Sequence, residues 1–338
     1  MLRLKITDAR AMIESALAAN GYTADEPATI ADHLMDCELR GLGYAGLARA
    51  VAIIEHDRRS NLTRRAITIR HESAVSASLD GGDDLGYLVA MRATGMAITK
   101  AQASGIGIVG ASRTHFTGMF SYYLERVTAA GLVGMIAGSG PSAVAPHGGT
   151  EPRFSTNPIA FGFPSDGLPV IWDISTSSIT HAEVLLAMRL GEPLPSGSAF
   201  DAEGNATTDP SKVLGGGAMA TWGGHRGSGL ALSVQLLSMM AGQHNVHGPY
   251  PEPGDFGYLI TAIDPGLFGS ADEFRRSVSA YVEQIRQTRP LDPGTPVRLP
   301  FERSVKIRER TLAQGHIEVA DRVVETLHAF AKQTSSGG

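Results

Sequence analysis

The spacing of apolar residues predicts helices in the first sixty positions and a mixture of strands and helices after them. Apolar side chains recur there every three or four residues, which is the period of one helix face. We expect three helices in this part of the chain, at 11–19, 24–39 and 47–56. Glycines 41 and 43 mark the end of the second helix.

Short apolar runs separated by Gly and Pro follow from position 106 and are typical of strands. The predicted strands are 106–109, 132–137, 159–163, 170–172 and 258–263, with a strand-like alternation also at 66–80. Further helices are predicted at 86–103, 178–190, 230–240, 271–287 and 319–332. Residues 191–227 read as a polar, glycine-rich loop region. This order predicts an α/β core with helical flanks.

Composition and charge narrow the function classes. Hydrophobic residues make up 43% and charged residues 19% of the 338 positions, as in soluble globular proteins. The formal net charge of -5 argues against a nucleic-acid partner, which needs a concentrated basic surface. No apolar run reaches the ~18 residues of a membrane span and no signal-peptide pattern is present, so we expect a cytoplasmic protein. Cys37 is the only cysteine, which excludes an intramolecular disulfide.

Three glycines spell the G-x-G-x-x-G pattern of dinucleotide-binding Rossmann folds: Gly105, Gly107 and Gly110. In a Rossmann fold this pattern follows a strand and begins a helix, whose N-terminus binds the pyrophosphate. Here the predicted helix ends at Gly105, and the pattern itself is the predicted strand. We therefore interpret these glycines as a helix stop followed by a strand.

The sequence predicts no metal site. His244 and His247 have a spacing that could nominally hold a metal ion. No third ligand accompanies them, so a loop is the simpler interpretation.

Four ordered segments carry a family resemblance. They are residues 113–118 (RTHFTG), 146–149 (PHGG), 155–158 (STNP) and 222–230 (WGGHRGSGL). In this order and spacing they resemble the type II malate/L-lactate dehydrogenase family, which includes ureidoglycolate dehydrogenase, diketogulonate reductase, sulfolactate dehydrogenase and the piperideine and pyrroline carboxylate reductases. The resemblance extends over essentially the whole chain and includes residues 173–177 (DISTS). Each motif alone is weak, whereas the ordered set is specific.

The resemblance implies a fold that is α/β but not Rossmann. It combines a cofactor domain around a mixed sheet with a helical domain, in a homodimer. Residues 71–284 would form the nicotinamide-cofactor domain. Residues 1–70 together with 285–338 would form the helical domain, which binds substrate and takes part in dimerisation.

The resemblance also implies NADH or NADPH as the cofactor and assigns its contacts. They are His147, Gly148, Thr156, Asn157, Asp173, Ser175, Thr176, Ser177, Gly224, Arg226, Gly227, Phe301, Glu302 and Arg303. At Arg226 the family has a lysine, so the positive charge is kept and its geometry changes. The glycine-rich turn leads into the predicted helix at 230–240, where backbone N–H groups and the helix dipole can hold a phosphate. The alternative is a glycine-rich helix start without a ligand.

The substrate motif of the family departs here at its central residue. The family has Ser-His-Gly followed by an arginine that binds a substrate carboxylate, and this chain reads Tyr44-Ala45-Gly46 followed by Arg49. Arg49 matches the carboxylate-binding position and can form a bidentate pair; a surface helix arginine is the alternative. Ala45 replaces the histidine that exchanges a proton in the family, and alanine cannot do so. General acid–base catalysis is typically worth ~10²–10⁴ in rate.

Three explanations for Ala45 stay open. His115 or Tyr44 supplies the proton; His115 matches a histidine that accepts a proton in the ureidoglycolate branch, although a cofactor or core contact explains it equally well. Alternatively, the substrate is an iminium that needs no acid, or redox chemistry is lost. Asp173 matches a family aspartate near the active site and is the third catalytic candidate; capping of a turn by a strand-end aspartate is its alternative.

These observations predict an NAD(P)-dependent oxidoreductase that transfers hydride to or from a small carboxylate-bearing substrate. A 2-oxo or 2-hydroxy acid and a cyclic imino acid both fit. The alternative is a non-redox lyase, isomerase or ligand-binding protein on the same scaffold. The paired changes at Ala45 and Arg226 are the features that favour this alternative.

Overall fold

The computed structural model describes residues 1–60, 63–243 and 256–332. The chain forms two compact units, one of Met1–Thr63 with Glu302–Gly338 and the other of Arg64–Phe301. It thus passes between units after positions 63 and 301, whereas the sequence-based boundaries follow positions 70 and 284. The roles assigned to the two domains stay predictions. His244 and His247 lie outside the described residues.

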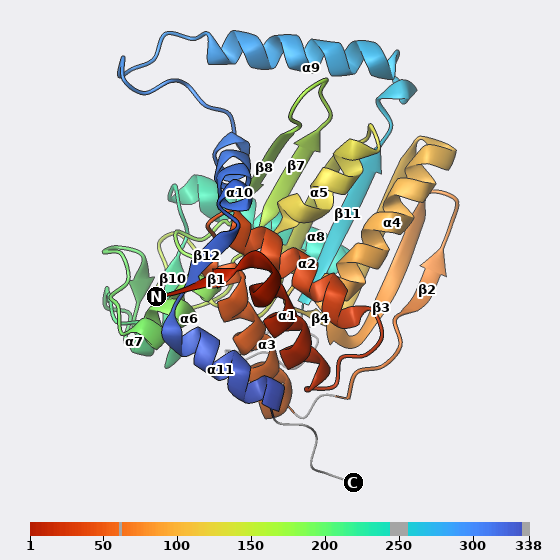
Figure 1. The fold of residues 1–338 in the computed structure, drawn as a ribbon. Helices are drawn as coiled ribbons and strands as arrows, with labels where there is room; N and C mark the ends of the chain where they lie inside the picture. Colours follow the sequence, from red (N-terminus) through yellow and green to blue (C-terminus); the bar gives the residue numbers. More distant parts are fainter. Residues whose placement is uncertain (61–62, 244–255, 333–338) are drawn as a thin grey trace. The chain divides into compact units, whose positions relative to one another are not determined.

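The smaller unit consists of helices and one pair of strands. Its elements are β1 (Leu2–Lys5), α1 (Ile6–Ala18), α2 (Glu26–Leu39), the 3-10 turn η1 (Gly43–Ala45), α3 (Leu47–Ser60), α10 (Glu302–Gln314), β12 (His316–Val319) and α11 (Asp321–Lys332). β1 pairs antiparallel with β12, which joins the N-terminal strand to a strand near the end of the sequence (Figure 1). Helices α1, α2, α3 and α11 pack on one another through apolar faces at helical spacing. Fully buried members of this core include Ile13, Leu17, Ile30, Leu34, Ile53 and Leu327.

A buried ion cluster links α10 to α2. Arg40 is almost fully buried, and its Nε donates to Asp36 Oδ2 at 2.7 Å. The other oxygen of Asp36 forms an ion pair with Arg308 Nε of α10 at 3.1 Å. Buried charges need such compensation, so this cluster fixes one side of α2.

The larger unit is built on a mixed seven-stranded sheet of order β2-β3-β4-β11-β5-β7-β8 (Figure 1). The strands are β2 (Thr68–Glu72), β3 (Ser76–Leu85), β4 (Ile106–His115), β5 (Val133–Ser139), β7 (Ile159–Phe163), β8 (Val170–Ile174) and β11 (Phe256–Ile263). β3 and β4 pair in parallel, and the other neighbours in the sheet are antiparallel. The last of these strands in sequence, β11, lies at the centre. A Rossmann sheet is mostly parallel, so the predicted non-Rossmann α/β fold is confirmed.

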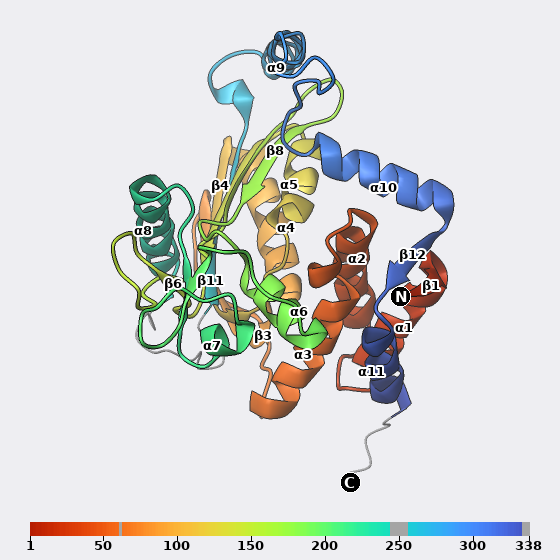
Figure 2. The same ribbon diagram turned by 90° about the vertical axis from the view of Figure 1, so that its left-hand side faces the viewer.

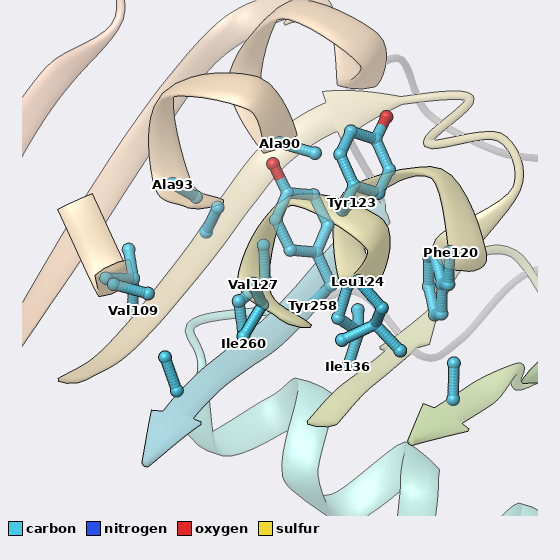
Figure 3. Packing of buried hydrophobic residues seen from close by; sticks show 14 of the residues in the cluster. Ala90, Ala93, Val109, Phe120, Tyr123, Leu124, Val127, Ile136, Tyr258 and Ile260 are labelled. Atoms are coloured by element: carbon cyan, nitrogen blue, oxygen red, sulfur yellow. The ribbon is translucent and has the colours of Figure 1, made fainter. Parts of the chain in front are cut away.

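Helices cover both faces of this sheet (Figure 2). On one face lie α4 (Gly86–Ser104) and α5 (Phe120–Ala129), and on the other lies α8 (His225–Met240). Figure 3 shows the first interface, where Ala90 of α4 and Val127 of α5 belong to the same core as Ile136 of β5. The neighbouring Ala137 packs with Val234 of α8. Adjacent strand residues point to opposite faces, so β5 contributes to both cores.

A second, smaller sheet extends the larger unit. It pairs β10 (Ala218–Ala220) with β6 (Val144–Ala145) and β9 (Ala199–Phe200). Two helices accompany it, α6 (His181–Leu190) and α7 (Pro210–Leu214), and their apolar residues share a core with Val144 and Met219. The turn η2 (Pro265–Leu267) and α9 (Ala271–Arg286) follow β11.

The rejection of a Rossmann phosphate loop is confirmed. Gly105 ends α4 in the left-handed conformation with φ 81°, and β4 begins at the next residue. A Cβ on Gly107 would overlap the carbonyl oxygen of Ala97, so this glycine allows α4 to pack closely on β4. The glycines serve packing within the larger unit. Three α-helices were not predicted from the sequence, α5, α7 and α10. The interpretation of 191–227 as a loop region was wrong in part, because β9, α7 and β10 lie within it as short elements.

Candidate cofactor and substrate sites

The first turn of α8 is shaped by glycine. Gly223 and Gly224 have φ values of 62° and 59°, which favour glycine, and Gly224 is the N-cap. A Cβ on Gly227 would overlap the carbonyl oxygen of Trp222, so the turn folds back tightly on its own backbone. No side-chain oxygen caps this end of α8. The positive end of the helix dipole is therefore not neutralised by a cap from the described residues.

The loop that carries His147 and Gly148 lies against this turn. The backbone N–H of His147 donates to Ser228 Oγ at 3.1 Å, and the ring centroids of His147 and His225 are 6.4 Å apart. The side chains of His147, His225 and Arg226 are exposed. Together with the backbone of the turn, they make a donor set that fits a phosphate group of a nucleotide cofactor.

Residues 175–177 join the same turn from the end of β8. Ser175 Oγ and Thr176 Oγ1 donate to the carbonyl oxygen of Thr156, at 3.0 and 2.9 Å. Ser177 forms an isolated β-bridge with Thr221, and Trp222 Nε1 donates to the carbonyl oxygen of Ser175 at 2.5 Å. The structure therefore brings together the predicted residues His147, Gly148, Thr156, Ser175, Thr176, Ser177, Gly224, Arg226 and Gly227.

Asn157 is fully buried and takes part in a polar network. Its amide nitrogen donates to the carbonyl oxygen of Ala231 in α8 at 2.8 Å, and Ser139 Oγ donates to its side-chain oxygen at 2.6 Å. Gln235 of α8 lies in the same network and donates to Gln243 Oε1 at 3.1 Å. These bonds hold α8 against the sheet. A direct contact of Asn157 with the cofactor stays a prediction.

Two catalytic candidates lie near the N-terminus of α5. His115 ends β4 and is buried with 1% of its surface exposed, five positions before α5 begins. Asp173 of β8 accepts a hydrogen bond from the backbone N–H of Ser121, in the first turn of α5, at 2.7 Å. Asp173 as a whole is exposed, but loss of hydration around its carboxyl group, which faces α5, raises its pKa, and the hydrogen bonds from Ser121 and Phe120 act in the opposite direction. Asp173 thus interacts with α5 rather than with the turn that follows β8.

The substrate motif begins α3 in the smaller unit. Tyr44 and Ala45 belong to η1, and Arg49 lies in the first turn of α3, where its N–H donates to the carbonyl oxygen of Gly46 at 2.9 Å. All three side chains are partly buried. Arg49 therefore has the fixed backbone position that a carboxylate-binding arginine requires.

Glu38 lies at the same turn and was not predicted from the sequence. Its Oε1 accepts a hydrogen bond from the backbone N–H of Leu47, the first residue of α3, at 2.7 Å. A Cβ on Gly46 would overlap the Glu38 side chain. Burial raises the pKa of Glu38 to about 7, although the hydrogen bond from Leu47 favours the charged form.

The remaining predicted cofactor residues stand where the chain passes between the two units. Phe301 has a positive φ of 76° and packs against the core of the larger unit. Glu302 begins α10 and is buried, whereas Arg303 is exposed. Their cofactor contacts stay predictions.

The parts of the chain that the structure describes hold neither a candidate metal site nor a candidate membrane span. No group of three or more His, Cys, Asp or Glu side chains there could hold a metal ion. No helix there is long and apolar enough to cross a membrane.

Relatives of known activity cover almost the whole chain. A malate/(S)-sulfolactate dehydrogenase from Methanothermus fervidus is 32% identical over 96% of each chain. A (2R)-3-sulfolactate dehydrogenase (NADP(+)) from Chromohalobacter salexigens is 31% identical, over 97% of this chain and 98% of its own. A Delta(1)-pyrroline-2-carboxylate/Delta(1)-piperideine-2-carboxylate reductase from Pseudomonas aeruginosa is 30% identical, over 93% and 95%.

Solved structures and the family model agree with these relatives. The crystal structure of a dehydrogenase from Sinorhizobium meliloti superimposes with a TM-score of 0.90 at 30% identity, over 98% of both chains. The family model described as malate/L-lactate dehydrogenase matches residues 4–328. The chain thus belongs to the malate/L-lactate dehydrogenase family of oxidoreductases.

Proposed function

We propose that the protein is an NAD(P)-dependent dehydrogenase or reductase of a small carboxylate-bearing substrate, either a 2-oxo or 2-hydroxy acid or a cyclic imino acid. The relatives named above act on sulfolactate, malate and pyrroline or piperideine carboxylates, and these substrates share a carboxylate beside a carbonyl, hydroxyl or imine. The observation that carries the proposal is the first turn of α8, which has no side-chain cap among the described residues, carries Arg226 and lies against His147.

The turn of α8 would hold a phosphate of the cofactor. Its glycines let the backbone approach an anion, and Arg226 adds a positive charge from an exposed position. Residues 175–177 would line the same site, because Ser175 and Trp222 are linked by a hydrogen bond. When bound, the nicotinamide cofactor supplies or accepts the hydride.

Arg49 would bind the substrate carboxylate in the smaller unit. A guanidinium group pairs with a carboxylate through two parallel hydrogen bonds and so fixes the orientation of the substrate. His115 or Tyr44 would exchange the proton, with Asp173 as a further member of the site. A non-redox activity on this scaffold is the second candidate, and Ala45 is the observation that favours it.

A homodimer is the proposed assembly. The outer face of α8 exposes apolar side chains four residues apart, Leu232, Leu236 and Met240, with exposed fractions of 49%, 54% and 68%. Such a stripe on a helix is typical of a protein interface, and a second copy would cover it. Leu236→Glu would then shift the sedimentation coefficient toward that of a monomer. We also propose a cytoplasmic location, which suits a chain whose one cysteine, Cys37, is buried and has no second cysteine to pair with.

The first test is a titration of NADH and NADPH into the purified protein, followed by nicotinamide fluorescence. We expect saturable binding of one or both cofactors that Arg226→Ala weakens. Arg276→Ala is the matched control, because it removes an exposed arginine from α9 instead. Absence of binding at millimolar concentration would overturn the redox proposal in favour of the non-redox alternative.

Turnover is the second test. A panel of 2-oxo acids and cyclic imino acids, assayed with the cofactor that binds, should contain at least one substrate. Arg49→Ala should raise KM for that substrate, while the Kd of the cofactor stays the same. No turnover across the panel at any pH would count against the proposed substrate class.

A further inference from the structure

We propose that the carboxyl group of Glu38 is the proton donor and acceptor of this active site, where Ala45 provides no titratable side chain. The proposal rests on the proposed oxidoreductase function. Glu38 lies outside the four motifs that carried the family resemblance. It would supply, from the turn that contains Ala45, the acid that alanine cannot supply.

The turn between α2 and α3 wraps around the carboxyl group of Glu38. Leu47 N–H binds Oε1 at 2.7 Å, and the absence of a Cβ on Gly46 makes room for the side chain. Oε2 lies on the Gly43 side, 3.8 Å from the position that a Cβ would occupy there. Ala45 lies between Gly43 and Gly46, so the turn that encloses the carboxyl group also carries the position at which the resemblance places the family's acid.

Charged groups on α2, and on α1 and α10 that pack against it, form ion pairs with partners other than Glu38. Asp36 and Arg40 are two residues from Glu38 on either side, which places them about 200° away around α2. Arg308 of α10 binds Asp36, and Arg10 of α1 binds Asp32 at 2.6 Å. Tyr44 of η1 and Arg49 of α3 are the titratable or charged groups at the turn itself.

The surroundings of Glu38 suit a group that exchanges protons near neutral pH. Burial disfavours the carboxylate and raises its pKa to about 7, so the acid and the base forms coexist at neutral pH. An ordinary glutamate with a pKa near 4.3 would be almost fully ionised and a poor donor. The hydrogen bond from Leu47 can be accepted by either form, so proton release does not break the turn.

The chemistry balances without a further reactant. In reduction, the substrate carbonyl or imine carbon gains the hydride and its two electrons, and the oxygen or nitrogen gains the proton of Glu38. Glu38 is left as a carboxylate, which takes a proton from water before the next turnover. In oxidation, the carboxylate accepts the proton of the hydroxyl or amine while the hydride leaves. Arg49, which lies two residues after Leu47 in the first turn of α3, holds the substrate carboxylate.

The competing interpretation is structural, with Glu38 serving only to cap α3. Glu38→Gln separates the two, since the amide oxygen still accepts the Leu47 hydrogen bond but cannot exchange a proton. A cap alone predicts unchanged kinetics for this variant. The proposal predicts a fall in kcat of about 100-fold or more with KM within a factor of three, because general acid–base catalysis is lost. It also predicts loss of the ionisation near pH 7 from the rate profile. Glu14→Gln, in a partly buried ion pair of α1 with Arg10, is the control and should leave kcat unchanged.

Rescue sharpens the kinetic test. Glu38→Gln combined with Ala45→His should recover at least tenfold in kcat, because the histidine restores a proton donor at the turn. Retention of the wild-type kcat and pH profile by Glu38→Gln would overturn the role of Glu38 while leaving the oxidoreductase function intact. Absence of turnover by the wild-type protein would overturn both.

A direct titration adds a readout that needs neither cofactor nor substrate. In protein labelled with ¹³C at glutamate side chains, the Glu38 carboxyl resonance, assigned by its loss in Glu38→Gln, should titrate with a midpoint near 7. A midpoint below 5 would overturn the proposal, even if the variant proved unstable in the kinetic assay.

Discussion

Helices α3 and α8 each follow a glycine, Gly46 and Gly224, and each carries an arginine in its first turn, Arg49 and Arg226, but the two helix starts differ in what binds their N–H groups. At α3, the first N–H group binds the carboxyl group of Glu38, which the chain itself supplies. At α8, the described residues provide no side-chain cap, and the turn packs on the backbone of Trp222. The positive end of a helix attracts an anion in either case. At α3 the carboxyl group comes from the protein, whereas at α8 we propose that the anion comes from a ligand.

The two turns should also differ in the substitutions that they tolerate. The turn of α8 is built from backbone groups, so its function depends on glycines that leave room for tight folding. The turn of α3 depends on one side chain, Glu38, and on the space above Gly46. Glycine substitutions test the first dependence, and titration tests the second.

The largest effect is expected for Gly227→Ala. The new Cβ would overlap the carbonyl oxygen of Trp222, and a backbone group cannot move aside without opening the turn. We expect a loss of unfolding free energy of about 3 kcal/mol or more, together with loss of cofactor binding. Chemical denaturation and cofactor titration measure the two effects.

Gly229→Ala is the matched control in the same helix. A Cβ there meets no atom within 4 Å, and alanine favours a helix over glycine. The variant should gain up to about 1 kcal/mol and keep the wild-type cofactor affinity. Equal losses in both variants would show that the turn of α8 has no special need for tight folding.

The next effect concerns stability against pH. The pKa of Glu38 is about 7 in the folded chain against an ordinary value of 4.5, so between these pH values the folded state keeps a proton that the unfolded state has released. The contribution of Glu38 to the free energy of unfolding therefore falls by about 3 kcal/mol as the pH rises between these two values. Urea unfolding at pH 5 and pH 7.5 should show this fall in the wild type, and Glu38→Gln should reduce it. Identical pH dependence in the two proteins would mean that Glu38 ionises normally.

An intermediate effect is expected for Gly46→Ala. Its Cβ would overlap Glu38, so the side chain must leave and Leu47 loses its acceptor. We expect a loss of about 2 kcal/mol in thermal or chemical unfolding. Gly43→Ala is the control, because its Cβ would lie 3.8 Å from Glu38 Oε2 in ordinary contact. If Gly43→Ala were the more damaging of the two, the turn would not be organised around Glu38.

The smallest effect is expected for Arg226→Lys. The charge stays and the backbone donors of the turn are unchanged, so the Kd of the cofactor should shift by less than about threefold, or roughly 0.6 kcal/mol. Fluorescence titration measures it. A loss as large as that of Arg226→Ala would show that the guanidinium geometry, rather than the turn, holds the phosphate.

Hydrophobic spacing predicted most of the fold because the elements involved are strongly patterned. The strand 159–163 and the helix 271–287 match β7 and, within one residue, α9. Helix α5 was missed although Phe120, Tyr123, Leu124 and Val127 have helical spacing and are buried. Its ten residues follow a strand closely, so the glycines around it suggested short strands instead. Helix α10 was missed for a different reason, because its mostly polar sequence leaves little apolar pattern to find.

The candidate sites were predictable to the extent that they are contiguous in sequence. The turn at 222–230 could be interpreted because the glycines and the helix lie side by side in the chain. The role of Glu38 could not be predicted, because the chain reverses direction between Glu38 and Leu47. The reversal uses Gly41, which is in the left-handed conformation, and the turn η1. Its raised pKa comes from enclosure by that reversal, which no local pattern expresses.

The polar network around Asn157 affects how the surface of α8 can vary over evolutionary time. Hydrogen bonds have direction, so those from Asn157 to Ala231 and Gln235 set the rotation of α8 about its own axis, which apolar contacts alone leave adjustable. Outer residues such as Leu236 make no contribution to that setting. A substitution there can therefore change the proposed dimer contact without turning α8, so the glycine turn at the start of the helix keeps its orientation.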